Sequence, residues 1–400
     1  MSLSRSPRFI ILLVLVTVLG PLAMQMFLPA LPAIQKEFAT TAGTAQLALT
    51  LAMVAIGVAT LVFGPVSDRF GRKPVLIAGI VFYIAGSFVV VLADSIPLLL
   101  AGRVVQAGGA SAGIVLARAM ARDVYGFAQS IRVVSYLTMA MVVAPTLSPA
   151  IGGLVADSFG WRAIFWIMCV VGALALLGVV LGLAETNPAR APGGWRGLVE
   201  GCRRLIVSRR YLGYSLVSTA SFCVFFSFLA AAPFLMAEVL HRPARDYGFW
   251  FMPVAGIFIV GTFLSTRFLD RHGADRLIRF GAFATLFVVV AALPFYYLLP
   301  LSPPLLFVPA ALFSLTQGFV IPNCQASAIN VDPRYAGAGS GLIGFIGMAM
   351  SAVVAQIVAE IADGTVWPMV YFMIGAAVVS VLCLPLIRKE PQAKPPSEPG

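Results

Sequence analysis

Charged side chains are scarce in this sequence. They make up 11% of the 400 residues, while hydrophobic residues make up 60%. Soluble domains carry roughly 25% charged residues, so this chain cannot cover an ordinary water-facing surface. It can form a surface that contacts lipid, because hydrocarbon solvates apolar side chains directly. The composition therefore predicts an all-α membrane protein.

Cysteine and histidine are also too few and too scattered to form a reactive centre. None of the five cysteines forms a CxxC pair, and both histidines, His241 and His272, lie in expected loops. The cysteines are interpreted as small hydrophobic residues rather than disulfides or metal ligands. The sequence contains no nucleophile–base pair and no phosphate-binding loop, so we expect neither an enzyme nor a bound metal or cofactor.

Twelve apolar stretches are long enough to cross a bilayer as helices. Their expected bounds are 9–33, 44–66, 74–93, 97–120, 132–156, 162–184, 211–238, 247–267, 277–300, 303–329, 336–361 and 367–387. The predicted domains are an N-terminal six-helix bundle at 1–184 and a C-terminal six-helix bundle at 211–387. A cytoplasmic linker at 185–210 joins them, and a disordered cytoplasmic tail follows at 388–400. Within the linker, residues 197–210 are a candidate helix in the membrane interface.

The basic residues predict the orientation. If both termini are cytoplasmic, 22 of the 27 lysines and arginines fall on the cytoplasmic side, four fall outside, and Arg103 falls within a span. This bias follows the positive-inside rule and accounts for the net charge of +11. Because no single basic surface is formed, we do not expect nucleic-acid binding.

A charged hairpin, Gly64–Pro74 (GPVSDRFGRKP), joins the second and third spans. Its Asp68 is the only acid between Glu37 and Asp94. A degenerate copy (DRHGADR) begins at Asp270, which is 202 residues further on (270 − 68). A charged hairpin repeated at about half the chain length indicates a duplicated membrane protein that moves.

Further motifs stand at fixed places relative to the spans. They are Met26–Pro32 (MFLPALP), Arg103–Gln106 (RVVQ), Ala121–Tyr125 (ARDVY), Ala144–Gly153 (APTLSPAIGG) and Gly160–Trp166 (GWRAIFW). With the hairpin and the twelve spans, they resemble the major facilitator superfamily, and within it the drug:proton antiporters of the bicyclomycin/chloramphenicol-resistance type. The match is dense in the first half and rests mainly on layout in the second half.

The resemblance implies the major facilitator fold, with two pseudo-symmetric six-helix bundles. It also implies a secondary active transporter of the bacterial inner membrane, with multidrug or small-molecule efflux by alternating access. The expected partners are a small-molecule substrate, protons and the lipid bilayer, and we expect a monomer.

The resemblance further implies that the hairpin docks against the other half and latches the outward-facing state. The predicted latch residues are Gly64, Asp68, Arg69, Gly71, Arg72, Lys73, Arg122 and Asp123. Here Gly71 would permit the tight turn and Gly64 a close helix approach. The alternative for the basic residues is that they only set the topology.

Arg103 is expected about seven residues into the fourth span, roughly 10 Å below the surface. Intramembrane charges are costly and usually functional, although a long side chain can also extend to the head groups. The resemblance associates this arginine with substrate and proton coupling. The candidate substrate-binding residues are Gln25, Arg103, Phe225, Phe226, Gln317 and Asn323. The alternative for the two phenylalanines is lipid contact or packing.

The fifth span carries rows of small residues that let two helix backbones meet closely. The resemblance identifies Pro145, Ser148, Pro149, Gly152 and Gly153 with the antiporter signature, with Ser148 where a glycine is usual. Ordinary helix packing is the alternative interpretation.

The first span departs from the family pattern at Gln25, where related antiporters usually have an acid. Glutamine cannot carry a proton, and no Asp or Glu lies near the middle of any predicted span. This leaves a second hypothesis, a metabolite or organic-anion transporter that works by uniport or exchange, which the positive charge of Arg103 would suit. A non-transporting membrane sensor is a remote alternative, because a static scaffold needs no duplicated hairpin.

Overall fold

The computed structural model describes residues 7–187 and 194–387, so the predicted tail at 388–400 lies outside the described residues. Within these ranges the chain is helical and has twelve helices long and apolar enough to cross a membrane. The twelve predicted spans are thus confirmed, each to within a few residues of its expected bounds.

The first half begins with a broken span. The helical elements are α1 (Pro7–Gln25), the 3₁₀ turn η2 (Leu28–Ala30), α2 (Leu31–Glu37), α3 (Ala42–Phe70), α4 (Arg72–Val91), α5 (Ile96–Phe159) and α6 (Trp161–Gly182). The predicted helix at 9–33 is interrupted after Gln25, because Pro29 and Pro32 stand at the starts of η2 and α2. Proline has no N–H to continue a helix but suits its first turn. The long α5 contains two spans, which turn at Gly126 with φ +68°.

A short helix, α7 (Gly194–Val207), precedes the second half. The later elements are α8 (Arg209–Phe234), the π-helical turn η3 (Leu235–Val239), α9 (Ala244–His272), α10 (Ala274–Ala291), α11 (Leu293–Leu298), α12 (Pro303–Ile329), the 3₁₀ turn η4 (Pro333–Tyr335), α13 (Ala336–Glu360), α14 (Trp367–Leu382) and the 3₁₀ turn η5 (Leu384–Ile387). The predicted ninth span, 277–300, is divided near Ala292 into α10 and α11.

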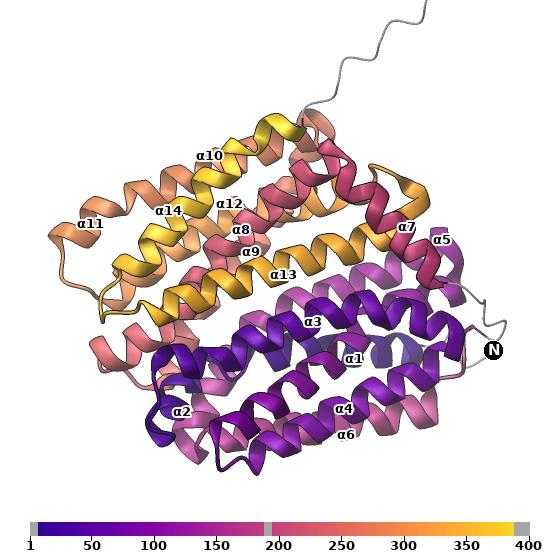
Figure 1. Cartoon of the computed structure of the whole chain (residues 1–400), viewed down its shortest axis with the longest axis horizontal. Coiled ribbons are helices and arrows are strands. Elements are labelled where there is room, and N and C mark those ends of the chain that lie inside the picture. The colour runs from indigo at the N-terminus through magenta and orange to yellow at the C-terminus, as the bar shows by residue number, and fades with distance from the viewer. Residues whose placement is uncertain (1–6, 188–193, 388–400) are drawn as a thin grey trace, which may run out of the picture.

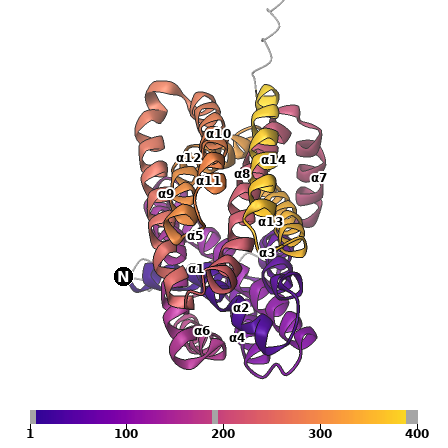
Figure 2. The same cartoon turned by 90° about the vertical axis from the view of Figure 1, so that its left-hand side faces the viewer.

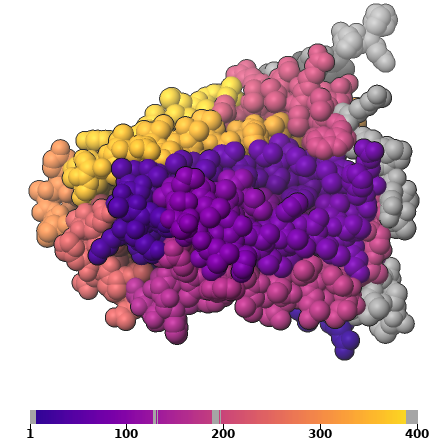
Figure 3. Space-filling model, turned by 60° about the horizontal axis from the view of Figure 1, so that its bottom comes forward, coloured from indigo at the N-terminus to yellow at the C-terminus, as the bar shows by residue number. Residues whose placement is uncertain are grey.

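The long helices run side by side, and the two halves lie against each other (Figure 1). Seen from one end, the first half occupies the lower part of the molecule and the second half the upper part (Figure 2). Two helix pairs join the halves, α3 with α13 and α5 with α9. We call these pairs the two seams. In the space-filling view the indigo first half meets the yellow-orange second half along a continuous boundary (Figure 3).

Glycines bring backbones together along the fifth span. A Cβ on Gly152 would overlap the carbonyl oxygen of Met26, after α1. A Cβ on Gly153 would lie 2.5 Å from the carbonyl oxygen of Ala244 in α9, across the seam. In lipid, such close packing supplies much of the attraction between helices, since apolar burial gives little.

We therefore expect Gly152→Ala to destabilise the folded protein by about 1–3 kcal/mol through overpacking. The measurement is the thermal unfolding midpoint of the purified protein in detergent. The matched control is Gly344→Ala in α13, where no atom lies within 4 Å of the added Cβ. Equal midpoints for the two variants would contradict the packing argument.

Candidate functional site

The charged hairpin is organised around Arg72. Gly71 has φ +100° and joins α3 to α4, so the expected tight turn is formed by the residue type that tolerates this conformation. The Arg72 guanidinium contacts Asp68 through Nη2 at 2.7 Å and Asp123 through Nε at 3.1 Å. Its Nη1 donates to the Ser67 hydroxyl at 2.6 Å. One side chain thus joins the end of α3 to the middle of α5.

Glu185, which was not among the predicted site residues, completes this group. Its carboxylate accepts hydrogen bonds from the backbone N–H groups of Arg72 at 2.9 Å and Lys73 at 3.1 Å. A carboxylate at a helix N-terminus is favoured by unpaired N–H groups and by the helix dipole. The only sequence signal for Glu185 was its place directly after the sixth span.

The pKa of Glu185 reflects two opposing effects. Burial raises the pKa, but hydrogen bonds from backbone N–H groups outweigh burial and hold it below its ordinary value of 4.5. The donors are those of Asn187, Arg72, Lys73 and Thr186. The carboxylate is therefore an integral part of the turn.

The polar contacts of the hairpin described above run to its own half of the molecule and to Glu185, at the start of the segment that connects the halves. Lys73 Nζ also donates to the carbonyl oxygen of Val180 in α6 at 2.9 Å. The guanidinium of Arg69 lies 5.3 Å from the ring of its neighbour Phe70, and Arg122 is exposed. No atom lies within 4 Å of a Cβ placed on Gly64, so the close helix approach expected at that residue does not occur.

Arg103 is enclosed inside the first half. Its side chain has no exposed surface, which rules out the alternative that it extends to the head groups. Nε donates to the Ala48 carbonyl oxygen at 3.1 Å, Nη1 donates to Gln106, and the guanidinium lies 3.8 Å from the centre of the Phe27 ring. Neutral oxygens and an aromatic face therefore hold this charge, and the residue joins α3, α5 and the turn after α1.

The two polar residues predicted in α12 are engaged with neighbouring helices. Gln317 Nε2 donates to the Ser221 carbonyl oxygen in α8 at 2.9 Å. Asn323 Nδ2 donates to the Ser265 hydroxyl in α9 at 2.7 Å. Both side chains therefore tie helices together within the second half.

The other predicted substrate contacts are less constrained. Gln25 is partly buried, and its side-chain oxygen has no hydrogen-bond partner among the described residues. Phe225 is partly buried and Phe226 is 4% exposed, with their ring centres 5.7 Å apart. Of the six predicted substrate residues, Phe225 and Phe226 are therefore in contact with each other, and a shared site for all six stays a prediction.

Hydrogen bonds between the two halves gather at the end of the bundle opposite the hairpin. On one seam, the Asp157 carboxylate in α5 accepts from the backbone N–H groups of Ala244 at 3.1 Å and Arg245 at 3.0 Å, in the first turn of α9. This places an acid from one half at a helix N-terminus of the other. Asp157 was unpredicted, although it directly follows the predicted fifth span.

The other seam has a polar contact at the same end. Gln356 Nε2 in α13 donates to the Gly43 carbonyl oxygen in α3 at 2.9 Å. The hydroxyl of Thr50 donates in return to Gln356 Oε1 at 2.9 Å. We call the Asp157 and Gln356 contacts together the paired clasp.

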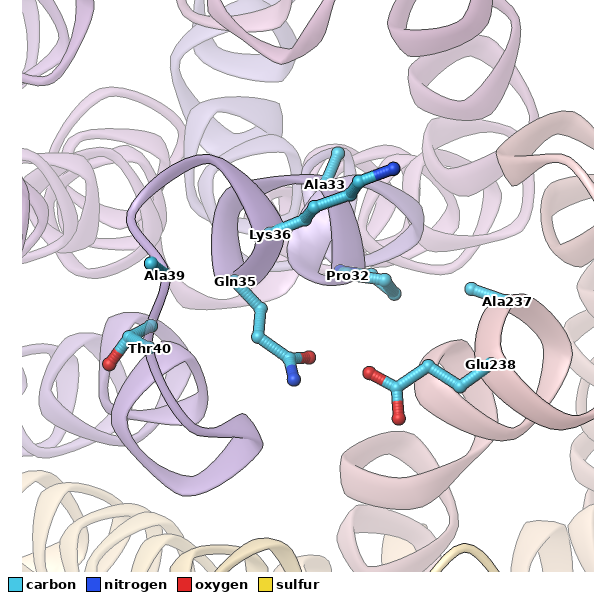
Figure 4. A pocket seen from close by; sticks show the side chains of 8 residues that line it. All are labelled: Pro32, Ala33, Gln35, Lys36, Ala39, Thr40, Ala237 and Glu238. Atoms are coloured by element: carbon cyan, nitrogen blue, oxygen red, sulfur yellow. The ribbon is translucent and has the colours of Figure 1, made fainter.

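A shallow pocket of about 460 Å³ also lies between the halves at this end. It is lined by α2, the loop after it and the π-helical turn η3. The side chains of Gln35 and Glu238 point toward each other across it (Figure 4). The clasped end therefore retains a small open recess between the two halves.

Comparison with known proteins gives a consistent result. The family model of the Major Facilitator Superfamily matches residues 13–355. A bicyclomycin resistance protein homolog of Haemophilus influenzae is 30% identical over 94% of both chains. A chloramphenicol resistance protein of Pseudomonas aeruginosa is 30% identical over 90% of this chain and 86% of its own. Multidrug resistance protein D of Escherichia coli is 28% identical over 96% of this chain and 97% of its own.

A solved structure shows the same fold at much lower identity. The crystal structure of a D-xylose-proton symporter superposes with a TM-score of 0.70 over 93% of this chain and 96% of its own, at 13% identity. At that identity the likeness concerns the fold alone.

We expect Glu185→Gln to destabilise the hairpin, because a neutral amide accepts weaker hydrogen bonds at the start of α4. The expected loss is about 1–3 kcal/mol, read as a lower unfolding midpoint at neutral pH. The matched control is Glu200→Gln on α7, which removes an exposed acid that pairs with Arg204 in the next turn.

The Glu185 carboxylate also predicts that the stability of the folded protein depends on pH. Because its folded pKa is below 4.5, the Glu185 contribution is fully present above about pH 4.5 and is lost as pH falls through the folded value. The difference between wild type and Glu185→Gln should therefore shrink on acidification. A difference that is constant across this range would contradict the assignment.

Proposed function

This chain belongs to the major facilitator superfamily, and from that premise we propose that it exports small molecules, drugs among them, across a bacterial inner membrane by alternating access. The observation that carries the proposal is the pair of seams between two six-helix halves. Each seam is hydrogen-bonded at the same end of the bundle. A molecule built to rock about a central site needs two halves that separate at one end while they close at the other.

We assign the hairpin end to the cytoplasm and the paired clasp to the outside, with both termini cytoplasmic. The excess of arginine and lysine on the hairpin side supports this orientation. Under this assignment the molecule is closed toward the outside and faces inward. An inward-facing state also fits the hairpin, whose charges contact its own half rather than docking across to the other half.

The paired clasp is weak enough to open in every cycle. A carboxylate that caps a helix contributes about 1 kcal/mol, and a neutral hydrogen bond contributes about as much. A ligand or proton that favours the outward-facing state by a few kcal/mol can therefore break both contacts. The glycine contacts beside Asp157 make the closed seam tight, while few polar bonds hold it shut.

Within the central region, we propose different roles for the predicted substrate residues. Gln25 and Phe225 are only partly buried, so they can contact a solute in this conformation. Arg103, Gln317 and Asn323 are buried and hydrogen-bonded to backbone or side chains of neighbouring helices, and we propose that they position the helices around the site. The antiporter signature of the fifth span then acts through helix packing at the α5–α9 seam.

Coupling to protons needs a separate test, because Gln25 stands at the position where related antiporters usually have an acid that could carry the proton. The decisive experiment is transport in proteoliposomes with and without an imposed pH gradient, using cationic, neutral and anionic compounds. Gradient-driven export of a cationic or neutral drug would support proton-coupled efflux. Gradient-independent exchange of anions would support the organic-anion alternative, and no transport of any compound would contradict the proposal.

In the same assay we expect Gln25→Asp to acquire or strengthen a dependence on the pH gradient, because aspartate can bind and release a proton. The control is Gln35→Asp, which introduces the same acid in α2 at the rim of the outer pocket. A Gln25→Asp variant with the same response to pH as wild type would remove this position from the coupling mechanism.

We expect Asp157→Ala to shift the population toward the outward-facing state by about fivefold, which corresponds to the loss of about 1 kcal/mol from one cap. Spin labels at Phe159 and Leu298, exposed residues at the outer end of each half, would report the separation of the halves. Asp94→Ala, which removes an exposed acid at the same end, is the control. An unchanged distance distribution in Asp157→Ala would show that the contact of Asp157 with the start of α9 does not hold the α5–α9 seam closed.

A further inference from the structure

The helix α7 is attached to the inner end of the second half by one of its faces. A Cβ on Gly201 would lie 2.8 Å from the Ala338 side chain and 2.9 Å from the Tyr335 ring, both near the start of α13. Leu205, one turn further on, is 2% exposed and belongs to the second-half core. The helix also reaches α3 of the first half. This face of α7 is therefore satisfied by protein contacts.

A second apolar face of α7 stays largely exposed in the part of the chain that the structure describes. Trp195, Val199 and Ile206 fall along one stripe at helical spacing and are 46%, 63% and 47% exposed. The helix lies at the edge of the bundle and runs obliquely to the spans (Figures 1 and 2). An exposed stripe with a tryptophan at one end is typical of helices that lie in the membrane interface.

The charged residues of this segment are mostly positive. The segment 194–210 contains five arginines and one glutamate. Arg203 and Arg204 are exposed on the helix, and Arg209 is exposed directly after it. Among the residues that the structure describes, only Arg204 of these three has an ion-pair partner, which is Glu200 in the preceding turn. Guanidinium groups bind phosphate oxygens well, and each basic residue near an anionic bilayer contributes about 1 kcal/mol.

We propose that α7 is a lipid-binding helix that recognises anionic phospholipid head groups of the inner leaflet. Trp195, Val199 and Ile206 enter the boundary between head groups and acyl chains, while Arg203 and its neighbours hold the phosphates. An apolar stripe flanked by net positive charge, at the cytoplasmic end of a membrane-embedded bundle, fits this partner in both chemistry and position. The inference goes beyond transport and does not depend on the identity of the substrate.

The test uses the full-length protein with its five free cysteines replaced and one nitroxide label at Val199 or at Glu200. The protein is reconstituted into vesicles of phosphatidylcholine alone or mixed with increasing phosphatidylglycerol. The measurement compares relaxation of the label by oxygen, which enters the bilayer, with relaxation by a water-soluble nickel chelate. We expect the Val199 label to move into the bilayer as phosphatidylglycerol increases, while the Glu200 label stays in water.

The arginines are tested by the double variant Arg203→Gln/Arg204→Gln. We expect the depth change at a fixed phosphatidylglycerol content to fall by more than half in this double variant. The matched control is Arg271→Gln/Arg276→Gln, which removes two exposed arginines from the corresponding hairpin of the second half. This control should leave the depth change at Val199 unaltered.

Three outcomes would overturn the proposal. A Val199 label as accessible to the nickel chelate as the Glu200 label, in both kinds of vesicle, would point to a protein partner for the stripe. Equal immersion with and without phosphatidylglycerol would leave an apolar anchor with no anionic recognition. An equal effect of the control pair would assign the response to total surface charge rather than to α7.

Discussion

Close contact between helix backbones at glycine is the constraint on which this structure depends. In a bilayer, two apolar helices gain little by leaving lipid, so association relies on packing and on a few polar contacts. Gly152 faces the backbone at the break in the first span, and Gly153 faces the start of α9 across the seam. The first contact builds one half, while the second joins the halves. Because both occur on the same turn of α5, the packing of the first half and the closure of the α5–α9 seam are linked.

Arg72 and Arg103 have different surroundings. Arg72 lies at the membrane surface, where two carboxylates and a hydroxyl surround it. Arg103 lies inside the bundle and is held by neutral oxygens and aromatic rings. A buried charge without a carboxylate is costly, but no second ionisable group is required next to it. The first half can therefore keep its shape without depending on the protonation of a partner.

The connections between the halves differ in kind from those within them. Within each half, side chains such as Arg103 and Gln317 make buried hydrogen bonds that join neighbouring helices. Between the halves, at the clasped end, an exposed acid caps a helix and an amide bonds to the backbone. The Asp157 bonds lie at an exposed edge and can exchange with water at little cost, whereas the buried bonds within each half cannot. The bonds within each half are therefore better shielded from water than the Asp157 contact across the seam.

The sequence by itself determined the membrane class, the twelve spans and the glycine turn of the hairpin, because hydropathy and turn chemistry are properties of continuous segments of the chain. The resemblance to the drug:proton antiporters supplied the family, which the comparisons confirmed. The tertiary structure alone decided that Glu185 completes the hairpin, that Asp157 and Gln356 join the halves, and that Arg103 is enclosed. Each of these depends on contacts between segments about 50 to 300 residues apart. Such partners cannot be read from local pattern, because they are set by which helix backbones approach closely enough to bring a donor and an acceptor together.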